Sequence, residues 1–555
     1  MSSMSFATKR DPVTRLTVLG LWLVLALFVL YPLCRLLAMT FWGENGLTLD
    51  NLRPFLTSWY DQQSAVNSIL LACSVGAAGT LLGFVFAFVT TRMNLPGWLS
   101  AGIGAVTILP LISPPFTSSI ALTLLLGPNG MVLRLLGIES FNFYGFWGTF
   151  ISETLTFFPV AFMTIATVLS RIDANLEDAA YSLGATSSEV FRTVTLPLSA
   201  PGIANAFLLV FSCSLADFAT PQVLGGHTFP VLPTQAYLLI TGMYDFKSGA
   251  ALSFMLLVPA LAVYAIQHYW VGRRSYVTVS GKAGGRSSIK GPGAVISGLM
   301  ALVVALAIVF IAAIYSVILG GSLVKIWGIN NTLTLEHYSY VFTHGLQAIK
   351  DTLIIACVST PIGGLLAVLI GFAAARLKVR GYKTLETVSL LPYVLPGTVL
   401  GIAYIIAFND EPIILTGTLS ILVAAYVFRY SSAGIRSVIA ALTQIDPSIE
   451  EASLSLGATQ AKTFRLITVP LVLPAVLAGM KYLFIHSMTA ISATIFLVSV
   501  SWTLITTRIL ECMTELQFAQ ACAFSVVLIG LVFAASGAMT LIARIVCRTS
   551  GRIGA

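Results

Sequence analysis

Acidic, glycine and proline residues recur at fixed spacing in two polar segments of an otherwise apolar chain. The segment 177–186 returns as 450–459, an offset of 273 positions, and the copies stay in step for about twenty residues. Neither copy brings together a nucleophile and a base or a cluster of metal ligands, and the chain has no G-x-x-x-x-G-K-[ST] loop for phosphate. The pattern therefore favours recognition of a partner over catalysis. The residues selected are Glu177, Asp178, Ala179, Ala180, Gly184, Arg192, Pro197, Glu450, Glu451, Ala452, Gly457, Arg465 and Pro470.

Each copy is expected to form two short helices joined by a tight turn. Asp173 and Asp446 precede the first helix and are placed to cap it, and acidic residues in a first turn are favourable there. Gly184 and Gly457 stand where the chain must either turn or lie close against another backbone. Each copy is therefore predicted to be a surface knob, and two knobs suit a partner that is itself two-fold.

The composition is that of an integral membrane protein. Of 555 residues, 57% are hydrophobic and 9% are charged, whereas soluble domains carry about 25% charged residues. About twelve apolar runs reach the roughly 18 residues needed to cross the hydrocarbon core of a bilayer. These runs are 16–41, 68–91, 99–127, 145–169, 201–225, 248–271, 294–320, 352–375, 385–408, 414–435, 474–499 and 522–545.

The basic residues that give the chain its net charge of +8 follow the expected membrane topology. Lysine and arginine gather before the first run and in every second loop, including both copies of the repeated segment. By the positive-inside rule this asymmetry places both termini and both copies in the cytoplasm. The basic excess gives no reason to expect nucleic-acid binding. The seven cysteines are scattered without a C-x-x-C spacing, so neither a disulfide framework nor a metal site is expected.

The repeat divides the chain into two homologous halves. Residues 1–271 form the first half, with its repeated loop at 172–200, and residues 294–555 form the second, with its loop at 445–473. Residues 272–293 between them are rich in Gly, Ser and basic residues, as flexible linkers are. Six runs in each half predict an all-α fold of about twelve transmembrane helices, whose halves face the same way about a pseudo-two-fold axis along the membrane normal.

Prolines interrupt one apolar run of each half at matching places. Pro110 and Pro114 correspond to Pro392 and Pro396 at an offset of 282. Proline removes helix hydrogen bonds, which a membrane tolerates only where neighbouring groups or water satisfy the backbone. The pairs predict either kinks packed by neighbours or breaks with a structural role in both halves.

Five ionisable residues fall inside apolar runs, where their cost makes them candidates for a transport path. They are equally compatible with interhelical hydrogen bonds, or, for the arginine and the lysine, with side chains that reach the membrane surface. No group of them has the spacing of a metal site. The five residues are Glu153, Asp217, Arg429, Lys481 and His486.

The repeated segment resembles the EAA loop of permease subunits in binding-protein-dependent ABC importers, with the family pattern E-A-A-x3-G-x9-I-x-L-P. Departures are mild: Asp178 and Ser453 each replace an alanine, and Val469 replaces the leucine. The matching positions are Glu177, Ala180, Gly184, Val194, Leu196 and Pro197 in one copy, and Glu450, Glu451, Ala452, Gly457, Ile467 and Pro470 in the other.

The resemblance implies a MetI-like permease fold in the bacterial inner membrane, surrounded by lipid. In that family the loop is a coupling helix that docks on a homodimeric cytoplasmic ATPase, so ATP and Mg²⁺ would bind there and no cofactor would bind this chain. Cargo would arrive on a periplasmic or lipoprotein binding protein, and the chain itself would not be an enzyme.

Segments 216–226 and 487–497, which follow the two loops, look most like the fused iron(III) permeases. The resemblance extends to permeases for phosphonate, sugar phosphate, thiosulfate, thiamine and polyamines, so iron(III) is the leading expectation among several. An ion-coupled secondary transporter could also have two parallel halves. That class predicts the strongest self-similarity in substrate-facing helices, whereas here it peaks in the cytoplasmic loops.

Overall fold

The computed structural model is almost entirely helical. It describes residues 12–43, 46–93, 95–127, 130–138, 141–267, 269, 293–377 and 381–553, without the side chains of 12–14, 174, 294 and 547–553. The predicted linker 272–293 lies outside these residues except for Gly293. The strands in the described part form two short hairpins, β1 (Trp42–Gly43) with β2 (Gly46–Leu47), and β3 (Val324–Ile326) with β4 (Asn330–Leu333).

The first half contains long helices joined by short ones and by single π-helical turns. Its long helices are α1 (Pro12–Leu25), α2 (Tyr31–Phe41), α4 (Trp59–Arg92), α5 (Gly97–Ile112), α6 (Phe116–Leu126), α8 (Phe146–Leu169), α11 (Leu196–Leu215) and α13 (Phe246–Ile266). Its short elements are η2 (Ala26–Leu30), η3 (Asp50–Leu52), α3 (Arg53–Thr57), α7 (Met131–Leu136), α9 (Ala174–Ser182), α10 (Ser187–Val190), η4 (Phe191–Thr195), η5 (Pro221–Gly225), α12 (Leu232–Tyr237) and η6 (Leu238–Gly242).

The second half repeats this order. Its long helices are α14 (Ala294–Leu323), α16 (Leu346–Phe372), α17 (Tyr382–Val394), α18 (Gly397–Phe408), α19 (Leu419–Gln444), α22 (Val469–Thr489) and α25 (Phe518–Ile553). Its short elements are α15 (Glu336–Thr343), η9 (Ala373–Leu377), α20 (Ser448–Ser455), α21 (Gln460–Thr463), η10 (Phe464–Thr468), α23 (Thr494–Leu497) and α24 (Ile505–Thr514).

Ten helical segments in the described residues are long and apolar enough to cross a membrane, and the pair α17–α18, bent by 107°, makes an eleventh. Helix α19 completes the predicted twelve in position, although it carries Arg429 and Arg436 and does not meet the same test. Both proline pairs lie at breaks, between α5 and α6 and between α17 and α18. The breaks with a structural role that the prolines allowed are therefore observed.

Two predicted helix ends are wrong. The runs 201–225 and 474–499 were expected to be continuous, but α11 ends at Leu215 and α22 at Thr489. After Leu215 the carboxylate of Asp217 accepts a hydrogen bond from the Ala219 N–H (3.0 Å), which turns the chain. Hydropathy does not reveal these ends because the residues beyond them stay apolar and buried.

The core of each half is a trio of helices. Helices α4, α8 and α11 pack together in the first half, as α16, α19 and α22 do in the second. Small residues permit the close approach: a Cβ on Gly83 of α4 would stand 2.7 Å from the Phe162 backbone nitrogen of α8, and Gly479 of α22 lies directly against Gly434 of α19. The trios carry the two polar loops at matching places.

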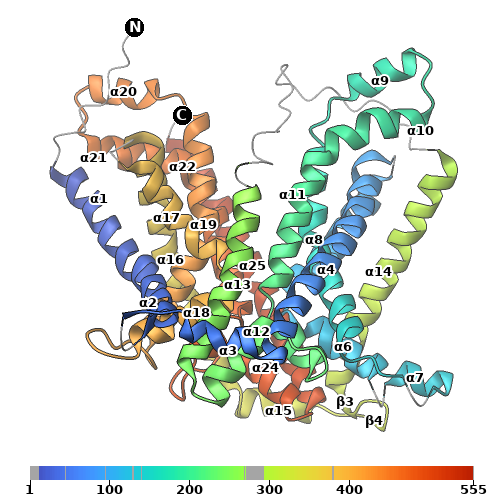
Figure 1. The fold of residues 1–555 in the computed structure, drawn as a ribbon. Coiled ribbons are helices and arrows are strands. Elements are labelled where there is room, and N and C mark those ends of the chain that lie inside the picture. The colour runs from blue at the N-terminus through green and yellow to red at the C-terminus, as the bar shows by residue number, and fades with distance from the viewer. Residues whose placement is uncertain are drawn as a thin grey trace.

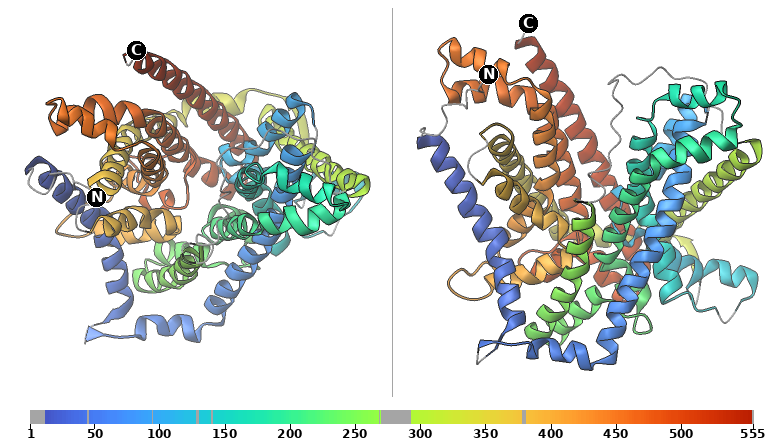
Figure 2. Two further views of the ribbon diagram at one scale, coloured as in Figure 1. Left: turned by 90° about the horizontal axis from the view of Figure 1, so that it is seen from above. Right: turned by 45° about the horizontal axis from the view of Figure 1, so that its top comes forward.

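The halves exchange their first helices. The α1–α2 segment packs on α17 and α18, where the Tyr404 hydroxyl donates to the Phe28 carbonyl (2.7 Å). Helix α14, the first of the second half, packs on α4, α5 and α6, and the hydroxyls of Tyr315 and Ser113 lie 2.6 Å apart. The two arms diverge toward the end that holds α9, α10, α20 and α21 and meet near α12 and α24 (Figure 1). Figure 2 shows the arms from above and from an oblique view.

Candidate functional site

The two repeated loops fold as matching knobs at the diverging ends of the arms (Figure 1). In the first knob α9 is followed by α10 and the π-helical turn η4, which runs into α11. In the second, α20, α21 and η10 run into α22 in the same order. The predicted pair of short helices with a turn between them is confirmed in both copies.

The first glutamate of the repeated motif in the first knob is buried. Glu177 is 4% exposed, and its Oε2 lies 2.9 Å from Nη1 of Arg92, the last residue of α4. Its Oε1 accepts a hydrogen bond from the Thr195 hydroxyl (2.8 Å), and Nη2 of Arg92 donates to the Leu169 carbonyl (2.8 Å). The glutamate therefore fastens the knob to α4 and to the end of α8.

The second knob repeats the arrangement. Glu450 is 3% exposed, and its Oε2 lies 3.1 Å from Nε of Arg376 in η9. The Thr468 hydroxyl donates to Oε1 (2.9 Å), and Nη2 of Arg376 donates to the Ile445 carbonyl (2.8 Å). Burial of such a pair is stable only when hydrogen bonds support the charges. In both knobs the carboxylate meets an arginine and a threonine hydroxyl and the guanidinium donates to a backbone carbonyl, while Nε of each arginine has no hydrogen-bond partner among the described residues. The glutamates and arginines are thus a duplicated anchor within the protein.

The two motif glycines adopt the left-handed backbone region. Gly184 has φ +90° and Gly457 has φ +87°, and a Cβ on either would meet no atom within 4 Å. The Ala185 N–H donates to the Ala180 carbonyl (3.1 Å), as the Ala458 N–H does to the Ser453 carbonyl (3.2 Å), which closes a Schellman-type turn. Of the two roles predicted for these glycines, the structure shows the turn and not a close backbone contact.

Side-chain caps begin the knob helices. Asp173 accepts a hydrogen bond from the Asn175 N–H (3.0 Å) and Asp446 from the Ser448 N–H (2.9 Å), as predicted. The backbone hydrogen bond from Ser448 lowers the pKa of Asp446 below its usual range. The carboxylate therefore stays charged at the helix N-terminus at neutral pH.

The helices α10 and α21 differ in their third residue. In α10, Thr186 and Glu189 form a reciprocal capping box in which the Thr186 N–H donates to Glu189 (2.7 Å). In α21 the same place is Lys462, whose N–H donates to the Thr459 hydroxyl (3.3 Å) without a return bond. The knobs match in backbone and anchor but carry opposite charge at this exposed position.

Leucine side chains project from both knobs into solvent. Leu183 is 88% exposed and Leu456, at the same place in the second copy, is 89% exposed. Leu176 and Ile449 are a second pair at equivalent positions, and each of these side chains is more than a third exposed. Asp178, Ala179, Arg192, Glu451, Ala452 and Arg465 are exposed around them, Pro197 is exposed, Pro470 is half-buried and Ala180 is half-buried beneath the turn.

A shallow hollow of about 440 Å³ lies on the second knob between α20 and α21. Ile449, Leu456, Gly457 and Lys462 contribute to its lining. The exposed surface of each knob is thus mixed, with an apolar centre and charged residues around it. This composition is typical of a surface that a partner protein covers.

Of the five ionisable residues predicted for a transport path, Glu153 and Asp217 lie within electrostatic range of each other in the first half. Glu153 of α8 is fully buried and accepts a hydrogen bond from Ser214 of α11, and Asp217 is buried at the turn after α11. Lys481 of α22 donates to the Thr540 hydroxyl of α25 (2.9 Å). Glu153 and Lys481 make the interhelical hydrogen bonds that the second interpretation allowed, whereas Asp217 bonds to the backbone of its own turn. Oε1 of Glu153 and Oδ2 of Asp217 are buried without a hydrogen-bond partner among the described residues.

Arg429 and His486 do meet, in the second half. The Arg429 guanidinium lies 5.7 Å from the centre of the Tyr430 ring, and the His486 ring stacks on the same tyrosine at 5.4 Å. Arg429 Nη1 also donates to the Leu395 carbonyl (2.8 Å) at the break between α17 and α18. The expectation that Arg429 reaches for the membrane surface is wrong, because its charge satisfies a backbone group inside the protein.

A family model described as the binding-protein-dependent transport system inner membrane component matches residues 79–276 and 367–546, one match in each half. This chain belongs to that family of permeases. The matched residues include both knobs, the helices α8, α11, α19 and α22, and the C-terminal parts of α4 and α16. The permease is therefore a translocation subunit of a binding-protein-dependent ABC importer, a multi-pass protein of the inner membrane, and its homologues are not themselves enzymes.

Relatives extend over most of the permease. The ferric transport system permease protein FbpB of Actinobacillus pleuropneumoniae is 36% identical over 529 residues, 93% of this chain and 76% of that protein. The putative ferric transport system permease protein FbpB 1 of Haemophilus influenzae is 37% identical over 498 residues, 87% of this chain and 78% of that protein. A second Haemophilus influenzae protein, the Fe(3+)-transport system permease protein FbpB 2, is 25% identical over 516 residues.

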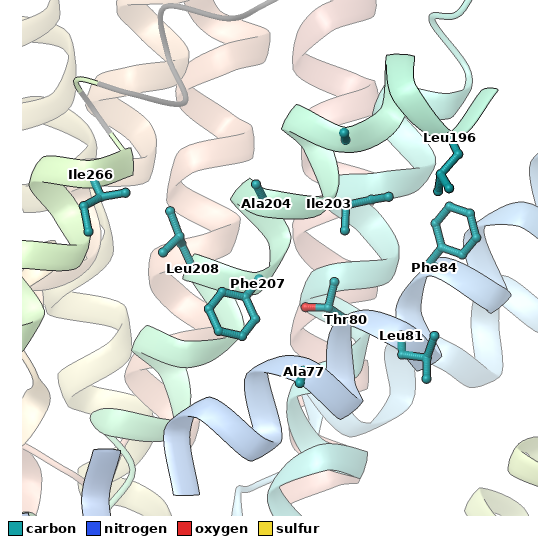
Figure 3. Close-up of a pocket in the computed structure, with 11 residues that line it drawn as sticks. Ala77, Thr80, Leu81, Phe84, Leu196, Ile203, Ala204, Phe207, Leu208 and Ile266 are labelled. Carbon is teal, nitrogen blue, oxygen red and sulfur yellow. The ribbon is translucent and has the colours of Figure 1, made fainter. Parts of the chain in front are cut away.

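The largest hollow whose lining residues are described is almost entirely apolar. It measures about 720 Å³ and lies between α4 and α11, where Phe84, Phe207 and Leu208 line it together with other apolar side chains (Figure 3). Thr80 contributes the hydroxyl seen there (Figure 3).

Sequence reasoning missed two groups of residues in the permease. Arg92 and Arg376, which stand near the ends of the equivalent helical segments α4 and α16–η9, were not predicted as partners of Glu177 and Glu450. Their joint repetition was a usable signal, since an acid and a base duplicated together predict a duplicated pair. The tyrosines around Arg429 gave no such signal, because the first half has no counterpart of them.

Proposed function

We propose that this permease imports iron(III) that an extracytoplasmic binding protein delivers. The support is the extent of similarity: the two ferric permeases named above share more than a third of their residues with this chain over most of its length. Permeases named for other cargo match less of it. The sulfate permease protein cysT of Helicosporidium is 29% identical over 35% of this chain, and the spermidine/putrescine permease PotC of Escherichia coli is 25% identical over 39%.

The knobs are the docking sites for two copies of a cytoplasmic ATPase. The observation that carries this proposal is the matching pair of exposed leucines, Leu183 and Leu456, set on turns held by buried ion pairs. Apolar side chains this exposed on two rigid, equivalent surfaces favour a partner with two equivalent grooves. ATP and Mg²⁺ bind to that partner, and its closure would draw the knobs together.

Both termini and both knobs face the cytoplasm in this proposal. The basic residues that flank the knobs, among them Arg171 and Arg192 in the first half and Arg465 in the second, support the orientation through the positive-inside rule. With the knobs inside, the diverging ends of the arms open inward and the binding protein docks at the opposite end (Figure 1).

Reconstitution in proteoliposomes tests the proposal. We expect uptake of radioactive iron to require ATP, the ATPase and the iron-loaded binding protein, and sulfate and spermidine not to compete. The double variant Leu183→Asp/Leu456→Asp should lose uptake and ATPase binding while its insertion into the membrane stays normal. Uptake that persists without any ATPase would contradict the importer mechanism and favour an ion-coupled transporter.

A further inference from the structure

A cluster of aromatic and basic side chains gathers on the second half, where α17, α19 and α22 face the other half. The His486 ring lies 4.1 Å from the Tyr482 ring and 5.4 Å from the Tyr430 ring, measured between centres. Tyr393 of α17 contacts Tyr482 through its hydroxyl. These rings form a continuous surface contributed by three helices.

Two guanidinium groups border this surface. Arg429 lies 5.7 Å from the centre of the Tyr430 ring, and Arg436, two turns further along α19, lies 5.5 Å from the centre of the Tyr393 ring. Arg436 is exposed, whereas Arg429 is half-buried and uses Nη1 on the Leu395 carbonyl. Phenol hydroxyls and guanidinium N–H groups are donors that suit oxygen anions, and arginine matches such anions with two N–H groups at once.

The first half has no counterpart of this surface. The offset of 273 that relates the knobs also relates α8 to α19 and α11 to α22, and 282 relates α5 to α17. The residues at the positions equivalent to the cluster are apolar or uncharged. They are Leu111, Thr156, Phe157, Met163, Leu209 and Cys213, opposite Tyr393, Arg429, Tyr430, Arg436, Tyr482 and His486 respectively.

The cluster faces the plane between the halves. Cys213 of α11 lies within electrostatic range of Arg429, and within range of Tyr393 and Tyr482 as well. Cys213 and His486 occupy equivalent positions, and equivalent positions approach one another only near the pseudo-two-fold axis. This is the region in which permeases built from parallel repeats place a path. The nearby carboxylates Glu153 and Asp217 are buried within the first half.

We propose that this cluster is a cargo-facing site for an oxygen anion. This inference rests on the proposed function. It means that iron(III) crosses the permease while an anionic oxygen ligand still coordinates it, and not as a bare trivalent cation. Two guanidinium groups repel a bare Fe³⁺. A phosphate- or carboxylate-type ligand gives the iron complex a negatively charged outer surface. Its oxygen atoms accept hydrogen bonds from the arginine and phenol donors.

Binding to the purified full-length permease in lipid nanodiscs tests this site separately from transport. The probes are ferric pyrophosphate, pyrophosphate alone, and hexaamminecobalt(III), a trivalent cation without an anionic ligand. We expect pyrophosphate to bind, and the variant Arg436→Gln/Tyr482→Phe to weaken binding by about tenfold or more, as removal of bonds to a charged group does. Arg436 is exposed and Tyr482→Phe keeps the ring, so the fold should be retained.

Lys481→Gln is the matched control, because it removes a charge from the same helix at a side chain that contacts α25. Its affinity for pyrophosphate should equal that of the unchanged protein. Binding of both pyrophosphate forms would show that the site recognises the anion itself, and binding of the ferric form alone would show that it recognises the complex. Either result supports the site if the double variant loses it.

Binding of hexaamminecobalt(III) without binding of pyrophosphate would overturn the inference, as would equal affinity in the double variant. Iron uptake that is normal in the double variant would also overturn it while the proposed function stood. Conversely, pyrophosphate binding by a permease that takes up no iron with its ATPase and binding protein would reject the proposed cargo and leave the anion site in place.

Discussion

The knobs of the two halves match residue by residue, whereas the central surfaces of the same two halves do not. Both knobs have a buried glutamate, an arginine from the end of α4 or from η9, a threonine donor, a left-handed glycine and an exposed leucine. At the axis, arginines, tyrosines and a histidine on one side stand opposite apolar residues on the other. With the two proposals above, the comparison predicts that the two halves receive force from the ATPase in the same way and meet their cargo in different ways.

Substitution of the knob glycines should have the largest effect on this comparison. Gly184→Glu and Gly457→Glu each force a side chain into a backbone region that non-glycine residues rarely adopt. Iron uptake by each variant should be abolished, with normal amounts of protein in the membrane. Gly137→Glu is the control, since Gly137 is also left-handed (φ +66°) with open space around it but lies outside the knobs. Wild-type uptake by both knob variants would reject the coupling role.

Removal of one partner of the buried ion pairs should come next. Arg92→Met leaves Glu177 charged and buried, and Arg376→Met does the same to Glu450, at a cost of about 3–5 kcal/mol. The two variants should lower the unfolding temperature of the purified permease by similar amounts. The double variant Arg92→Met/Glu177→Met should recover part of the loss. A large effect in one half only would break the equivalence of the knobs.

The threonine donors should have a smaller and again equal effect. Thr195→Val and Thr468→Val each remove one hydrogen bond to a buried carboxylate, worth about 1.5–3 kcal/mol for a charged acceptor. Thermal unfolding measures both. Thr193→Val is the control, because the exposed Thr193 hydroxyl donates to a backbone carbonyl in its own helix. Equal destabilisation by all three variants would show that the carboxylate anchor is unimportant.

The smallest effects should have opposite signs in the two knobs. Glu189→Lys removes the return bond of the capping box on Thr186 and should lower the unfolding temperature slightly. Lys462→Glu supplies a carboxylate that can complete a capping box with Thr459, and it should raise the unfolding temperature slightly. Binding of the ATPase to each single-knob variant, measured with the other knob disabled by Leu→Asp, would show whether the partner distinguishes the two charges. Identical responses to both exchanges would remove this difference between the knobs.

The repeat and the hydropathy predicted much of the fold because both are local or periodic properties of the sequence. They predicted the six-helix halves, the caps at Asp173 and Asp446, and either kinks or breaks at the paired prolines. They did not predict the ends of α11 and α22, since Ala216 to Gly225 remain mostly apolar, Asp217 apart, although the chain leaves α11 there. The exchange of α1–α2 and α14 between halves was also missed, because it depends on tertiary packing.

The candidate site was predicted in place but not in mechanism. The motif glutamates were taken for surface residues since charged residues in a polar loop are usually solvated, and only the geometry shows that Glu177 and Glu450 face inward. The exposure of Leu183 and Leu456 was not predicted because leucine side chains are usually buried. The aromatic cluster around Arg429 arises from three helices of the second half, and residues so far apart in sequence give no spacing that could be recognised.

The distance between the two knobs tests the central claim most directly. Spin labels on Thr193→Cys and Leu466→Cys, exposed and equivalent positions of η4 and η10 that leave the two docking leucines unchanged, report that distance in the reconstituted importer when the native cysteines are replaced by serine. We predict a shorter distance when ATP is bound to a hydrolysis-deficient ATPase than when nucleotide is absent. An unchanged distance, in a complex that still imports iron with the unmodified ATPase, would contradict the account.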